Sequence, residues 1–329
     1  MSPSFRHHRP ILSWLFPSAD AWEDRDLARR GDRRLPTFGF LVALLLASVG
    51  WAQPVLDVTD LTSSAFSTLE APDGSVFSDP LADHQTGQAT DDMVGDATLP
   101  GFFIGYGLLD GAEAFAFRFR LDDVGNKTEF TGNIRVGVAI DNDDSVDVFL
   151  GPKLSGNAAS QGITFQEATG TAPDSNTSPS TTSIGNAQQT IAFRTTGSDI
   201  NYDYQVAPET AANSFNGDVD AILTFALTFT ELNNALDVVL GTGTEFDIAS
   251  DSLMRFIAYT ATQPNSINQD LYGSDGITGT TTFATSGFTN FTDLTGTPIP
   301  EPGTWAMMGA LLFAPLLLKL RSRRTGRRG

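Results

Sequence analysis

The stretch AFAFRFRLDD, residues 114–123, alternates phenylalanine with small or charged residues. Phe115, Phe117 and Phe119 share one face of an extended chain, because successive side chains of a strand point to opposite sides. The segment NIRVGVAID, residues 133–141, repeats this spacing with isoleucine and valine. The period of two predicts two strands, each with one buried face.

Other short apolar runs extend this pattern along the chain. They predict further strands at residues 146–150, 190–194, 221–229, 253–262 and 279–283. The sequence TELNNAL, beginning at Thr230, predicts a short helix capped by that threonine. The polar segments 79–99 and 166–186 are typical of long loops. Short strands between turn-rich loops predict an all-β body, an antiparallel β-sandwich or jelly roll.

The charges are strongly segregated. The 329-residue chain carries a net charge of −19, yet residues 53–300 hold 33 Asp and Glu against seven Lys and Arg, a net of −26. Nucleic-acid binding depends on Lys and Arg neutralising phosphates, so we expect no nucleic-acid partner. The chain has no cysteine, and His84 is the one histidine of this body. This argues against thiolate or multi-histidine metal sites and against histidine-dependent triads.

The N-terminal region has the features of a secretory signal. Arg33 and Arg34 precede the apolar run FGFLVALLLA at residues 38–47, and small residues follow at Gly50 and Ala52. This pattern predicts a signal peptide over residues 33–52, cut between Ala52 and Gln53 by signal peptidase after passage through the secretion translocon. An uncleaved membrane anchor is the alternative. Residues 1–32 are interpreted as a disordered extension or a misassigned start.

The C-terminal region combines an apolar run with a basic tail. Residues 305–318 carry no charge, and the last eleven residues hold six basic ones: Lys319, Arg321, Arg323, Arg324, Arg327 and Arg328. At about 1.5 Å per residue, residues 303–320 span ~27 Å, close to the ~30 Å hydrocarbon core. Basic residues directly after such a run favour a cytoplasmic tail. The sequence therefore predicts a short transmembrane helix.

Residues 298–329 resemble a known sorting signal. Pro300, Glu301 and Pro302, then Trp305, a Gly- and Leu-rich run and the arginine cluster are similar to the PEP-CTERM signal of exopolysaccharide-producing Gram-negative bacteria. The resemblance implies that an exosortase reads Pro300, Glu301 and Pro302, cuts nearby, and releases the body at residues 53–297. The C-terminal helix would then anchor the protein in the membrane only transiently, and the released body would reach the cell envelope or the exterior. A plain C-terminal anchor is the alternative.

An acidic turn at residues 141–147 (DNDDSVD) lies between two predicted strands. Oxygen-bearing side chains at alternate positions suit calcium, which accepts six to eight oxygen ligands. The candidate ligands are Asp141, Asp143, Ser145 and Asp147. Asp122, Asp123, Asp218 and Asp220 are further candidates. A solvated acidic turn without an ion is the alternative, and the spacing does not match an EF-hand.

The sequence predicts no enzymatic activity. It carries no GxSxG, HExxH or phosphate-loop motif. We expect an exported envelope or extracellular-matrix protein with a structural or adhesive role, stabilised by calcium. The first alternative is a module that binds extracellular polysaccharide, and a glycan-active enzyme is the second. A sugar-binding platform would use phenylalanines or the body's tyrosines: Tyr106, Tyr202, Tyr204, Tyr259 and Tyr272.

Overall fold

The computed structural model describes residues 53–84, 92–122, 130, 132–140, 145–154, 161–168, 184–207, 214–215, 217, 219–241, 247–261, 267, 269–274, 288–290 and 292–294. The predicted signal peptide, the sorting signal and the predicted strand at 279–283 lie outside them. Within the described ranges, no helix is long and apolar enough to span a membrane.

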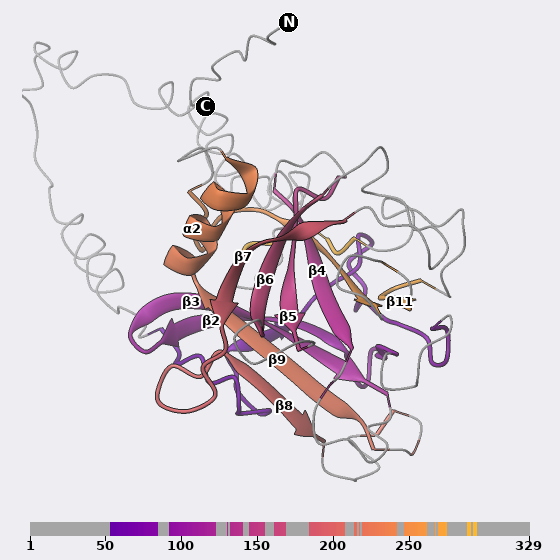
Figure 1. The fold of residues 1–329 in the computed structure, drawn as a ribbon. Helices are drawn as coiled ribbons and strands as arrows, with labels where there is room; N and C mark the ends of the chain where they lie inside the picture. The colour runs from indigo at the N-terminus through magenta and orange to yellow at the C-terminus, as the bar shows by residue number, and fades with distance from the viewer. Residues whose placement is uncertain are drawn as a thin grey trace, which may run out of the picture. The chain divides into compact units, whose positions relative to one another are not determined.

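The described residues form two antiparallel sheets and one helix (Figure 1). The first sheet has the order β1-β2-β3-β9-β8, with bounds Phe66–Thr68, Phe102–Leu109, Ala112–Leu121, Ala221–Thr228 and Tyr202–Val206. The second has the order β11-β10-β4-β5-β6-β7, with bounds Asp270–Leu271, Arg255–Ala261, Asn133–Ala139, Val148–Lys153, Gly162–Ala168 and Ile184–Ala192. The all-β prediction is confirmed.

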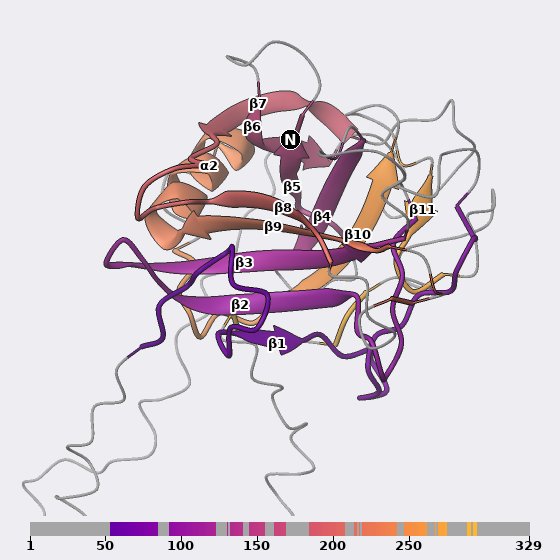
Figure 2. The ribbon, with the colours of Figure 1, turned by 90° about the horizontal axis from the view of Figure 1, so that it is seen from below.

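The facing sides of the two sheets enclose the main apolar core. In Figure 2 the strands of the first sheet lie side by side, and β4 and β10 of the second sheet run across them. Phe117 of β3 meets Phe256 of β10 edge to face, with ring centroids 5.0 Å apart. Phe102 stacks on Phe119 within the first sheet at 4.8 Å. The phenylalanines of the alternating stretch therefore hold the two sheets together. Each buried ring stabilises the folded protein by about 1.5–3 kcal/mol.

Both faces of the central strands are buried, whereas the alternation predicted one buried face. Arg118 on β3 and Arg135 on β4 are 4% and 0% exposed. Arg118 Nη2 donates to the carbonyl oxygens of Asp60 at 2.9 Å and Val58 at 3.3 Å, so the chain before β1 packs over the outer face of the first sheet. The prediction was wrong here because strand periodicity carries no information about segments that cover a sheet from outside.

The helix α2 (Phe229–Leu240) follows β9 without a loop. Its N-cap is Thr228, and the predicted cap at Thr230 is wrong. Thr228 Oγ1 accepts from the Glu231 amide at 3.1 Å, and the Glu231 carboxylate accepts from the Thr228 amide at 2.9 Å, which is a capping box. The helix contacts strands of both sheets through its buried residues Leu232, Ala235, Leu236 and Val239.

The predicted strands at 114–121, 134–140, 146–150, 190–194, 221–229 and 253–262 overlap β3, β4, β5, β7, β9 and β10. The structure adds β1, β2, β6, β8 and β11, which the sequence analysis did not predict. The predicted loop at 166–186 is wrong at both ends, because β6 extends to Ala168 and β7 begins at Ile184.

Candidate metal centre

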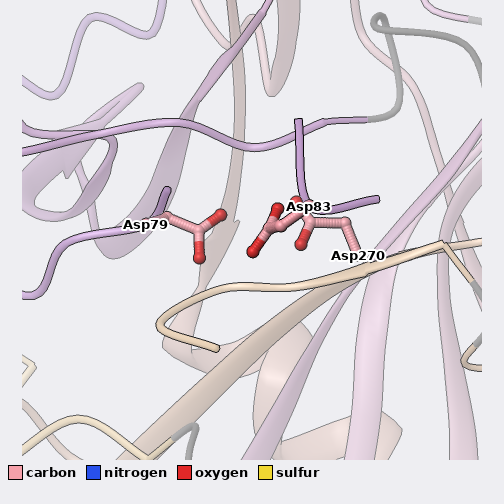
Figure 3. Close-up of side chains that lie close together, drawn as sticks. All are labelled: Asp79, Asp83 and Asp270. Atoms are coloured by element: carbon pink, nitrogen blue, oxygen red, sulfur yellow. The ribbon is translucent and has the colours of Figure 1, made fainter. Parts of the chain in front are cut away.

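Three aspartates from two segments that are far apart in the sequence lie close together. Asp79 and Asp83 belong to the chain between β1 and β2, and Asp270 begins β11. One carboxylate oxygen from each lies within 4.8 Å of the others. Figure 3 shows the three carboxyl groups turned toward a common space between the segments. We refer to Asp79, Asp83 and Asp270 as the aspartate centre.

Backbone amides fix two of these carboxylates in place. Asp79 Oδ1 accepts a short hydrogen bond from the Gly273 amide, and Asp270 Oδ2 accepts from the Met93 amide at 2.6 Å. The second oxygen of each group, Asp79 Oδ2 and Asp270 Oδ1, is buried and has no hydrogen-bond partner. Each carboxylate thus has one oxygen held by the protein and one unused, although buried polar atoms are nearly always paired.

Asp92 lies beside the aspartate centre and shapes it. Its side chain is fully buried, and its Oδ2 accepts from the Ala82 amide at 2.7 Å. Ala82 has φ 63°, a left-handed conformation that costs a non-glycine residue free energy and that precedes Asp83 directly. His84 Nδ1 lies 3.2 Å from Asp92 Oδ1, without the geometry of a hydrogen bond. Asp92 therefore holds the turn that carries Asp83.

The surroundings disfavour negative charge on these groups. Burial first, and then the carboxylates of Asp270, Asp83 and Asp92, raise the pKa of Asp79 well above its ordinary value. Burial, Asp83 and Asp92 raise the pKa of Asp270 in the same way. Among the described residues, no lysine or arginine forms an ion pair with Asp79 or Asp270. A bound cation would remove both the repulsion and the unpaired oxygens.

The donor set indicates which cation fits. Carboxylate oxygens without sulfur or imidazole suit hard ions such as Ca²⁺ and Mg²⁺. Separations within 4.8 Å are compatible with three oxygens that share one ion at Ca–O bonds of about 2.3–2.6 Å. Mg²⁺ keeps several water ligands and seldom occupies a site made of protein oxygens alone, which favours Ca²⁺ at this buried position. The aspartate centre thus has the donor chemistry of a calcium site.

Two glycines allow the segments around the centre to approach. Tyr272 Oη donates to the Phe77 carbonyl at 3.1 Å and accepts from the Gly101 amide at 3.2 Å. A Cβ on Gly101 would lie 1.9 Å from the Val94 carbonyl oxygen, and one on Gly95 would lie 2.5 Å from Tyr272 Oη. The nearest neighbours of that Cβ on Gly101 are backbone atoms of Val94, which cannot move aside as the end of a flexible side chain could. These contacts place Asp79 against β11.

Gly101→Ala is therefore expected to destabilise the protein by about 2 kcal/mol or more and to weaken calcium binding. The measurement is the urea midpoint with and without calcium. Gly74→Ala is the matched control, because Gly74 has φ 80° and no atom within 4 Å of its added Cβ, so it reports backbone strain alone. A Gly101→Ala cost no larger than that of Gly74→Ala would contradict the packing argument.

The acidic turn predicted as the calcium site is only partly described. Asp141 and Asp143 lie outside the described residues, whereas Ser145 and Asp147 lie inside them. Asp147 Oδ2 accepts from the Ile140 amide at 2.7 Å, and the Asp147 amide donates to the Val138 carbonyl at 2.9 Å. Asp147 thus closes the turn between β4 and β5, and calcium binding by the acidic turn stays a prediction because two of its four candidate ligands lie outside the described residues.

Two of the further acidic candidates, Asp122 and Asp220, lie within the described residues, and neither is a member of the aspartate centre. Asp220 Oδ2 forms an ion pair with Arg120 Nη1 at 2.7 Å, which neutralises it. The Asp122 amide donates to the Asp92 carbonyl at 2.9 Å, so Asp122 helps to position Asp92 through its backbone. Asp123 and Asp218 lie outside the described residues. The predicted sorting residues Pro300, Glu301 and Pro302 and the cleavage residue Ala52 also lie outside them.

Asp79, Asp83 and Asp270 are not among the ligands predicted from the sequence. The first two stand in a segment interpreted as a loop, and Asp270 contacts that segment across 177 residues of chain at Met93. No local spacing links the two parts. The one available signal was Met93 and Val94, an apolar pair inside an otherwise polar segment, and both are fully buried.

Comparison of the chain with protein-family models, with curated proteins and with solved structures gives no match in any of the three.

Proposed function

We propose that this chain is an exported envelope or matrix protein with a structural or adhesive role, whose body is stabilised by calcium at the aspartate centre. The observation that carries the proposal is the pair of unpartnered, buried oxygens of Asp79 and Asp270. A protein with those groups and no cation would bear a large desolvation and repulsion cost.

The burial of the site favours a structural metal over a catalytic one. Asp79 is 1% exposed and Asp270 0% exposed. A catalytic metal needs an open coordination position that substrate and water can reach. The centre instead joins the segment before β2 to β11, near the two ends of the folded body. Calcium there would act as a cross-link between distant parts of the chain.

Export is proposed from the sequence signals at both ends. Gln53, the predicted first residue after signal-peptidase cleavage, donates to Tyr106 Oη at 2.7 Å and Glu113 Oε1 at 2.6 Å. A folded body anchored from Gln53 onward is consistent with removal of the preceding residues. The exterior would also supply calcium, since extracellular modules bind it with dissociation constants of about 10⁻⁴–10⁻³ M.

The route makes a direct prediction for the protein recovered from its native cells and medium. Intact-mass measurement should show a chain that begins at Gln53 and has lost the six basic residues of the tail. Glu301→Gln should leave the C-terminal tail in place and keep the protein with the membranes, because an altered motif would no longer be read by the exosortase. Full-length chain in the medium, or unchanged processing of Glu301→Gln, would contradict the proposed route.

Sugar binding is the second candidate, because the outer face of the first sheet contains a cavity of about 310 Å³. This volume lies at the lower end of the range of small-molecule sites. Two of the tyrosines predicted to form a sugar-binding platform, Tyr259 and Tyr272, are fully buried and cannot contact a sugar. Tyr106, Tyr202 and Tyr204 are partly exposed but do not line the cavity.

A further inference from the structure

The cavity on the outer face of the first sheet has a charged floor. Arg118 and Arg120 of β3 and Phe103 of β2 project to this side, opposite the phenylalanines of the core. The chain around β1 and the ends of β8 and β9 complete the wall. The lining residues are Leu61, Thr62, Ser63, Phe66, Phe103, Arg118, Arg120, Ala207 and Ile222.

The two arginines differ in their partners. Arg120 is neutralised by its ion pair with Asp220 at 2.7 Å. Arg118 donates from Nε to Thr224 Oγ1 at 3.0 Å and from Nη2 to two backbone carbonyls, all of them neutral acceptors. In the part of the chain that the structure describes, Nη1 of Arg118 makes no hydrogen bond and no carboxylate is ion-paired with this guanidinium.

The charge of Arg118 is nevertheless retained. Burial lowers its pKa to about 10, while the carboxylates of Asp60, Asp203 and Asp57 oppose that shift, so the group is protonated at neutral pH. Asp57 and Asp60 are exposed, and each accepts hydrogen bonds from the threonine two residues ahead, Thr59 and Thr62. These acids surround the guanidinium without bonding to it. They disfavour a multiply charged anion more than a ligand with one carboxylate.

The remaining wall suits a ring. The guanidinium of Arg118 lies 3.7 Å from the centroid of the Phe66 ring, which fixes its plane. Phe103 and Ile222 supply apolar surface, and Thr62 and Ser63 bring hydroxyl groups to the same cavity. Since Nε and Nη2 of Arg118 are already engaged, Nη1 is the donor that remains for a ligand carboxylate, and the charge of the guanidinium strengthens that hydrogen bond.

We propose that this cavity binds a cyclic monocarboxylate of the size of one sugar ring, with the carboxylate on Arg118 and the ring against Phe103. Two sources share this chemistry, a uronic-acid unit and an apolar ring acid. The uronic-acid source rests on the sugar-binding candidate above, whereas the cavity and its arginine do not. The proposal is independent of the aspartate centre.

The test is calorimetric and NMR titration of the mature protein, in calcium, with glucuronate, cyclohexanecarboxylate and glucose. Binding of either acid, with no binding of glucose, is expected. Binding of glucuronate alone would identify a uronic-acid unit as the ligand. Binding of cyclohexanecarboxylate alone would support the cavity proposal and would exclude sugar binding as the function. Binding of glucose as tightly as glucuronate, or of none of the three, would overturn the proposal.

Variants separate recognition from folding. Arg118→Gln should weaken acid binding about tenfold or more, the loss expected for a charged hydrogen bond. Since Arg118 also holds the chain before β1, Ala207→Leu provides a second variant that fills the cavity and leaves the arginine in place. Ala192→Leu, at an exposed position of β7, is the matched control and should bind as wild type. Unchanged acid binding by folded Ala207→Leu would place the ligand elsewhere and refute the assignment.

Discussion

Asp270→Asn is expected to abolish the calcium-dependent rise in melting temperature and to raise the melting temperature in chelator above that of the wild type. With calcium at about 100 times its dissociation constant, the wild type should gain ~2.7 kcal/mol, and the variant should gain almost none. Without calcium, the buried Asp270 carboxyl group either carries a charge without a counter-ion or takes up a proton that the unfolded chain does not hold, and Asn removes this cost, so a gain of about 1–3 kcal/mol follows. The measurement is thermal or urea unfolding in both conditions.

Asp270→Asn should be less stable than the wild type in calcium and more stable in chelator. This pattern identifies a calcium ligand, since a loss of packing would lower stability in both conditions. Asp143→Asn serves as the matched variant in the acidic turn first predicted to bind calcium. It should keep the calcium response. Loss of that response in Asp143→Asn, with its retention in Asp270→Asn, would move the site to the turn.

Calcium is also expected to invert the pH dependence of stability. In chelator, the folded protein binds more protons than the unfolded chain, because the pKa values of Asp79 and Asp270 are raised above the ordinary value of 3.8. Stability should therefore rise as the pH falls through the interval between the raised pKa values and the ordinary value of 3.8. Each group that gains a full proton contributes up to ~1.4 kcal/mol per pH unit.

With calcium bound, the carboxylates are ionised in the folded state, and protons compete with the ion. Stability should then fall over the same interval as the pH is lowered. Unfolding midpoints at several pH values, with calcium and with chelator, give two slopes of opposite sign. Parallel slopes would mean that calcium does not act on these carboxyl groups.

The strands that the sequence predicted are those with a local signal. Phe115, Phe117 and Phe119 alternate because their side chains fill the core between the sheets, and both the period and the burial are local consequences of that position. The hairpin of β2 and β3 also had a signal that went unused. Asp110 and Gly111 have φ 50° and 81°, as a two-residue hairpin turn requires, and Asp-Gly between apolar runs predicts such a turn.

The aspartate centre could not be predicted in the same way. Its ligands come from an irregular segment and from a two-residue strand, and the turn at Ala82 is held by a hydrogen bond that the Ala82 amide donates to Asp92. Four clustered acids at 141–147 gave a stronger local pattern than single acids far apart. A local cluster of charges is visible in the sequence, whereas a buried metal site depends on contacts between distant segments.

The most direct test of the account is an anomalous difference map from crystals of the mature protein grown with calcium, or with manganese as a stronger scatterer. We expect a peak between the carboxylates of Asp79, Asp83 and Asp270, with calcium at about 2.3–2.6 Å from their oxygens. A well-ordered aspartate centre without a peak, at a calcium concentration that raises the melting temperature, would contradict the account.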